Sequence, residues 1–117
     1  MEEELIALLE AAISWRISWG SLGDGDGLPR AAIFRTGGDQ DHTQRGPGLV
    51  SSRIQIDCYG ATAGQAIGAA REVQAVLSGY RGGAIKGAFL KLVRDDERKD
   101  VSILARRSLI FSIVHRD

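Results

Sequence analysis

The chain has 117 residues, enough for one hydrophobic core but not for two, so we expect a single domain over residues 1–117. Fifteen basic residues balance fifteen acidic ones, and this zero net charge excludes a general attraction to nucleic acid or anionic membranes. A single cysteine excludes an internal disulfide and a thiolate zinc cluster. No apolar run approaches membrane-spanning length, and three early glutamates replace the basic region of a secretory signal, so we expect synthesis in the cytoplasm.

The first part of the chain predicts a helix and two short strands. Apolar residues recur every three or four positions from Leu5 to Ile13, and the glutamates of the first turn suit the helix dipole. We expect short strands over residues 17–19 and 31–35. Between them, residues 21–29 interleave glycine with aspartate and predict a loop.

Residues 37–48 combine glycines with charged side chains and have no apolar periodicity, so we expect an exposed connection between two strands. Hairpin loops usually have about two to five residues, and longer ones are commonly functional or become ordered when a partner binds. The candidate contact residues of this connection are Asp39, Asp41, His42 and Arg45.

The most informative segment is residues 53–78, where a strand runs directly into a helix. The strand alternates at a period of two, so Ile54, Ile56 and Cys58 share one face, and Arg53, Gln55 and Asp57 share the other. After Gly60 the period becomes helical. We expect this helix to bury Ala66, Ile67, Ala70, Val73 and Leu77, and to end at Gly79.

Two further strands complete the pattern, over residues 88–94 and 103–115, with the charged run 95–100 as the turn between them. On the last strand, Leu109, Phe111 and Ile113 share one face. The order helix, strands, helix, two strands is typical of an α+β fold. We expect a mainly antiparallel sheet of about four to five strands packed with two helices.

Two groups of acidic residues could supply ligands for a metal ion. Asp24 and Asp26 resemble the start of a calcium loop, but the distal glutamate ligand is missing, which favours a glycine-rich turn. Asp39, Asp41 and His42 are better explained as part of a solvated loop. We therefore expect no metal site and no cofactor.

Two other features could in principle be reactive or bind a ligand. Cys58 lies on the apolar face of its strand, where a buried thiol is inert. The glycine-rich segment 79–83 follows a helix instead of preceding one, and it lacks the lysine and serine of a phosphate-binding loop. A helix-ending turn is its simplest interpretation, and no catalytic constellation is evident.

Four segments together resemble a known protein family: the strand 55–60, the alanine-rich helix that ends near Ser78, the acidic run Asp95-Asp96-Glu97, and the closing strand 106–115. They are similar to the tail completion, or tail terminator, family of long-tailed bacteriophages and related prophage-derived particles. The resemblance covers most of the chain. Residues 20–29 depart from it because they are longer and richer in glycine than the family pattern.

The resemblance implies a structural protein, not an enzyme, that forms a ring, commonly of six subunits, at the head-proximal end of the tail tube. Such a ring stops tube growth and joins the tail to the head connector, while genome DNA passes through its lumen without sequence-specific binding. The implied partners are other copies of the chain, the tail tube protein, and the connector or head-closure protein, with no membrane contact. The implied location is the virion, after assembly in the host cytoplasm. The candidate interface residues are Asp39, Asp41, His42, Arg45, Arg53, Asp95, Asp96, Glu97 and Arg98.

Two alternatives stay open on the sequence alone. A neck or head-closure protein shares the ring role but binds the connector instead of the tube. A small α+β enzyme or ligand-binding domain is the alternative from another class, with Asp39, Asp41, His42 and the turn 79–83 as its only candidate residues.

Overall fold

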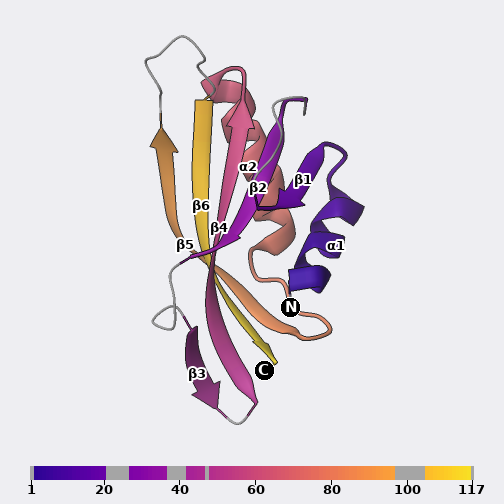
Figure 1. Ribbon diagram of the computed structural model, residues 1–117, viewed down its shortest axis with the longest axis vertical. Coiled ribbons are helices and arrows are strands. Elements are labelled where there is room, and N and C mark those ends of the chain that lie inside the picture. Colours follow the sequence, from indigo (N-terminus) through magenta and orange to yellow (C-terminus); the bar gives the residue numbers. More distant parts are fainter. Residues whose placement is uncertain (1, 21–26, 37–41, 47, 97–104, 117) are drawn as a thin grey trace.

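The computed structural model describes residues 2–20, 27–36, 42–46, 48–96 and 105–116. Its elements are, in chain order, α1 (Glu2–Ala12), β1 (Arg16–Trp19), β2 (Arg30–Arg35), β3 (His42–Gly46), β4 (Leu49–Gly60), α2 (Ala63–Leu77), β5 (Ile85–Asp96) and β6 (Ala105–Arg116). The molecule is elongated, with extents of 49 × 28 × 22 Å. α2 crosses one face of the sheet over β4 and β6, and α1 lies beside β1 (Figure 1).

Five strands follow one another across the sheet in the order β1-β2-β4-β6-β5, and β3 pairs with β4. β1 and β2 are parallel, whereas all the other paired strands are antiparallel. The expected α+β class, with a mainly antiparallel sheet and two helices, is therefore confirmed. The predicted N-terminal helix and the short strands at 17–19 and 31–35 are confirmed as α1, β1 and β2.

β4 is the central strand of the sheet. On one side it pairs with β6 over its whole length, from Leu49 opposite Arg116 to Gly60 opposite Ala105. On its other side it pairs first with β3 and then with β2. The β3 end of the sheet consequently extends beyond the region that the helices cover (Figure 1).

The hydrophobic core lies between the helices and one face of the sheet. The predicted alternation in β4 is confirmed, because Ile54, Ile56 and Cys58 are all fully buried. From β6, Leu109, Phe111 and Ile113 join the same core cluster. The helices contribute Leu5, Leu9, Ala69, Ala70, Val73 and Leu77, and Ile13 joins the core from the segment that follows α1.

The ends of α2 match their sequence signals. The hydroxyl of Thr62 accepts a hydrogen bond from the backbone N–H of Gln65 at 3.1 Å, which satisfies a free donor of the first turn. Ser78 is the C-cap, and Gly79 follows it with φ of 76°, a conformation that favours glycine. The helix ends where expected to within one residue: its C-cap is Ser78, and the predicted C-cap Gly79 takes the next position.

The predicted face of α2 needs one correction. Ala69 is buried where we expected Ile67, which is only half-buried. The reason is close packing at the start of the helix: a Cβ added to Gly60 would lie 2.6 Å from the backbone nitrogen of Ala66. Small residues therefore face the sheet, and the larger Ile67 is turned toward the margin.

Two predicted connections were partly wrong. Residues 42–46 are not loop, because β3 forms a ladder with β4, from His42 opposite Ser52 to Gly46 opposite Leu49. Asp95 and Asp96 belong to β5 instead of a turn, because their backbones pair with Arg107 and Arg106 of β6. The remainder of these connections, residues 37–41, 47 and 97–104, lies outside the described residues, as does 21–26 of the first predicted loop.

Candidate assembly surfaces

The candidate interface residues fall into two regions of the sheet. His42 and Arg45 lie on β3, Arg53 lies on β4, and Asp95 and Asp96 lie near the end of β5. The structure describes only the backbone positions of His42, Arg45 and Asp96. Asp39, Asp41, Glu97 and Arg98 lie outside the described residues. The candidates on β3 and on β5 are separated by β4 and β6, so they do not form one site.

Arg53 marks the point where β4 changes partner. The ladder with β2 ends at Ile54, and the ladder with β3 begins at Ser52. The carbonyl of Arg53 accepts a hydrogen bond from the backbone N–H of Thr36 at 3.2 Å. The side chain of Arg53 is exposed, on the face of the sheet away from α2.

Asp95 forms a two-point ion pair with Arg107 of β6. The guanidinium donates from Nε to Oδ1 at 2.6 Å and from Nη2 to Oδ2 at 2.9 Å. These hydrogen bonds lower the pKa of the Asp95 carboxyl. Arg107 also lines an open hollow against α2, together with Arg71, Gln74, Ala75 and Ser78. Asp95 is therefore engaged within the chain, in an ion pair that joins β5 to β6.

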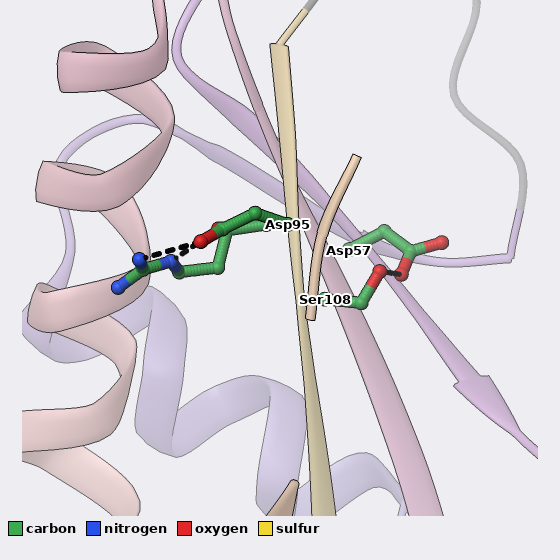
Figure 2. A network of polar contacts seen from close by, with 4 residues as sticks. Asp57, Asp95 and Ser108 are labelled. Carbon is green, nitrogen blue, oxygen red and sulfur yellow. Dashed lines mark hydrogen bonds and ion pairs between the residues drawn. The ribbon is translucent and has the colours of Figure 1, made fainter. Parts of the chain in front are cut away.

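A second polar cluster lies on the opposite face. Figure 2 shows Asp57 and Ser108 on the side of the sheet away from α2, and Asp95 on the side toward it. Asp57 is only 4% exposed, and it accepts hydrogen bonds from the Ser108 hydroxyl at 2.6 Å and from the Gln55 amide at 2.9 Å. Arg106 Nη1 lies 3.9 Å from the other carboxylate oxygen. The predicted position of Asp57 on the polar face of β4 is confirmed, but its burial does not follow from the period-two pattern.

The sheet also contains a serine–histidine pair that sequence distance concealed. His115 Nε2 lies 2.8 Å from the hydroxyl oxygen of Ser52, and its Nδ1–H donates to the carbonyl of Arg116 at 2.8 Å. The neutral ring then accepts from Ser52 through Nε2. Ser52 is 1% exposed and His115 6%, so this hydroxyl does not meet a substrate from solvent. The pair satisfies buried polar groups where the sheet extends beyond α2.

The cysteine has the environment that its place in the sequence predicts. Cys58 is buried, and desolvation, followed by the nearby carboxylate of Asp57, raises its pKa to about 12. A thiol with this pKa stays protonated and unreactive. Elsewhere in the described part of the chain, no three histidine, cysteine or acidic side chains gather as metal ligands would.

Exposed large apolar side chains lie on the two outermost strands. Phe89, Leu92 and Val93 of β5 are 51%, 50% and 38% exposed. Trp19 of β1 is 38% exposed. Since β1 and β5 are the two ends of the strand order, these side chains mark opposite edges of the sheet (Figure 1). These exposed apolar positions are not predictable from the sequence, because period-two patterns locate strand faces and not sheet edges.

These features define an α+β domain with its helices on one face and apolar residues at both sheet edges. None of the helices in the described ranges is long and apolar enough to cross a membrane. No protein-family model matches the sequence, and no curated protein matches it either. Among solved structures, the fold is similar to a chain described as "Virion of native gene transfer agent (GTA) particle", with a TM-score of 0.62 and 17% sequence identity. The alignment covers 97% of this chain and 84% of that one, and it establishes a shared fold.

Proposed function

We propose that this chain is a structural protein of a phage-like virion and that it forms a ring, with six subunits as the expected number. The ring caps the head-proximal end of the tail tube, stops tube polymerisation, and joins the tail to the head connector. Genome DNA passes through the lumen without sequence-specific binding. The chain acts through its shape and contacts, without a cofactor, in the virion and, during assembly, in the host cytoplasm.

The main support is the fold likeness to a virion chain, which extends over 97% of this chain. The resemblance to tail terminators, carried by the strand 55–60, the alanine-rich helix and the closing strand, agrees with a virion structural protein. The exposed apolar residues at opposite sheet edges add a physical argument. Unpaired strand edges favour association, and a head-to-tail contact generates a closed ring when its rotation closes.

Different parts of the fold have different tasks in this proposal. The helices and the central strands form the wall of the ring, and the sheet edges join neighbouring copies. The β3 end of the sheet, which extends beyond the helices, is suited to contact a neighbouring protein along the tail axis (Figure 1). The charged segments around residues 37–46 and 95–98 remain the candidates for contacts with the tube or the connector.

A tube-assembly assay tests this function. The tube protein of the same particle is polymerised with and without the purified chain, and tube lengths and ends are measured by negative-stain electron microscopy. We expect a ring at one end of each tube and no further growth from that end. A chain that leaves both ends free and tube growth unchanged would contradict the terminator role. Binding of the ring to the isolated connector but not to the tube would assign it to the head-closure position instead.

A further inference from the structure

The outer edge of β5 has a covered part and an open part. Near the start of the strand, the carbonyl of Ala88 accepts a hydrogen bond from the backbone N–H of Gly79 at 3.0 Å, so the turn after α2 lies against this part of the edge. From Phe89 to Asp96, β5 pairs with β6 on its inner side, and no other strand of the described ranges pairs with it. An edge strand of this kind offers backbone donors and acceptors to a second chain.

From Phe89 to Arg94, the exposed side chains of this open part of β5 are apolar and basic, whereas Asp95 beyond them is held in the ion pair with Arg107. Phe89, Leu92 and Val93 are the apolar ones, and Lys91 and Arg94 are both exposed. The ammonium group of Lys91 lies 6.0 Å from the centre of the Phe89 ring, so the positive charge is next to the apolar surface. Soluble proteins usually protect such edges with charge and bulges, and this edge has both, with a bulge between Leu90 and Leu92. The exposed apolar residues beside these features indicate a surface that becomes covered.

The opposite side of the molecule is formed by β1 and α1. Trp19 of β1 is its exposed apolar residue. On α1, Glu3 and Glu10 are exposed and seven residues apart, so they lie on one helical face, with Ala7 and Ala11 beside them. α1 contains no basic residue. α1 is therefore acidic, with small residues that permit close approach. The exposed Arg16 of β1 alternates with Ile17 and Trp19, so it lies on the other face of the sheet from Trp19.

We propose that the open edge of β5 in one copy docks against the α1 and β1 side of the next copy. The proposal rests on the proposed ring and names the surfaces that close it. The two surfaces differ in charge and lie on opposite sides of the molecule (Figure 1), so their contact is head-to-tail, as a ring requires.

Charge reversal tests this contact by native mass spectrometry of the full chain. One variant carries Lys91→Glu and Arg94→Glu, and a second carries Glu3→Lys and Glu10→Lys. Each variant alone has the same charge on both surfaces, so we expect each to need at least about tenfold more protein to form the oligomer. An equimolar mixture should restore assembly with the two variants alternating, and so should a single chain with all four substitutions.

The matched control is Arg71→Glu with Arg116→Glu, which changes the charge equally on α2 and at the end of β6, at exposed positions away from both surfaces. We expect this variant to assemble like the wild type, and circular dichroism confirms that every variant is folded. Wild-type rings with unaffected reversal variants, or with no recovery in the mixture, would overturn the proposed contact and leave the ring intact. A wild-type chain that stays monomeric up to millimolar concentration would contradict both the ring and the contact.

Discussion

Two carboxylates, one on β4 and one on β5, show that the surroundings of a residue decide how much its contacts contribute to stability. Asp57 is almost fully buried on the face without helices, and it depends on hydrogen bonds from Ser108 and Gln55. Asp95 is largely exposed and is held by Arg107 in a two-point ion pair. Removing a hydrogen-bond donor from a buried carboxylate lowers the free energy of unfolding more than breaking an exposed ion pair does. The reason is that water cannot reach the buried group to replace the lost donor.

Replacement of Ser108 by alanine should therefore destabilise the fold. Asp57 would lose its shortest hydrogen bond, at 2.6 Å, inside the sheet. We expect a loss of about 1 to 3 kcal/mol in the free energy of unfolding, measured by urea denaturation. Ser14→Ala, at an exposed position after α1, is the control and should change it by less than about 0.5 kcal/mol. Equal values for the two variants would show that the Asp57 cluster does not support the sheet.

The pKa of Asp95 gives a prediction for acidic pH. Because the hydrogen bonds from Arg107 lower this pKa in the folded chain, the ion pair contributes stability above the ordinary aspartate pKa. That contribution is lost as the pH falls through the lowered value. NMR titration should show the Asp95 carboxyl ionising at lower pH in the wild type than in Arg107→Gln. Identical titration curves would contradict the ion pair. The effect on stability should be small, since the pair is exposed.

At the scale of elements, the sequence predicted what depends on apolar periodicity and missed what depends on backbone pairing. The alternation of Ile54, Ile56 and Cys58 and the helical stripe of α2 follow from side chains that must be buried. β3 has no such pattern, since its place is set by hydrogen bonds to the extended β4. For the same reason, β5 continues through the charged residues Asp95 and Asp96.

The candidate site was predicted less completely than the fold. Charge and position in the chain identify Arg53 and the end of β5 as candidate contact regions. The pairing of Asp95 with Arg107, and the burial of His115 against Ser52, depend on the register between β4, β5 and β6. The register between strands that are far apart in the sequence cannot be predicted from a single sequence, because it depends on the packing of the whole sheet.

The core assignment makes a prediction that separates two phenylalanines. Phe111 is fully buried, whereas Phe89 is 51% exposed at the sheet edge. Phe111→Ala should lower the free energy of unfolding by about 2 to 5 kcal/mol, as should Ile56→Ala. Phe89→Ala should have a much smaller effect on the unassembled chain. Chemical denaturation measures all three, and an unchanged midpoint for Phe111→Ala would refute the face assignment.

The junction of β4 and α2 predicts opposite effects for two glycines. An alanine Cβ at Gly60 would approach the backbone of Ala66 to 2.6 Å, so Gly60→Ala should destabilise the fold. Gly68 lies inside α2 with open space around it, so Gly68→Ala should stabilise the chain by about 0.5 to 1 kcal/mol through helix propensity. Thermal unfolding compares the two, and a stabilising Gly60→Ala would show that the helix is not held this close to β4.

At the scale of the whole molecule, the zero net charge conceals an uneven distribution. Residues 89–94 of the β5 edge are apolar and basic, whereas α1 is acidic and lies beside β1, which exposes Trp19. An elongated domain with different opposite sides is suited to repeated head-to-tail contact. This arrangement connects the fold, shared with a virion chain, to the proposed role as a repeated structural subunit.

Electron cryomicroscopy of the complete particle tests the proposed role most directly. Labelled antibody fragments, or the density itself, locate this chain along the particle axis. The account predicts a closed ring of copies between the last layer of the tail tube and the head connector, with β5 of each copy beside α1 of the next. Single, separated copies of the chain, or its absence from the tail and neck, would contradict the account.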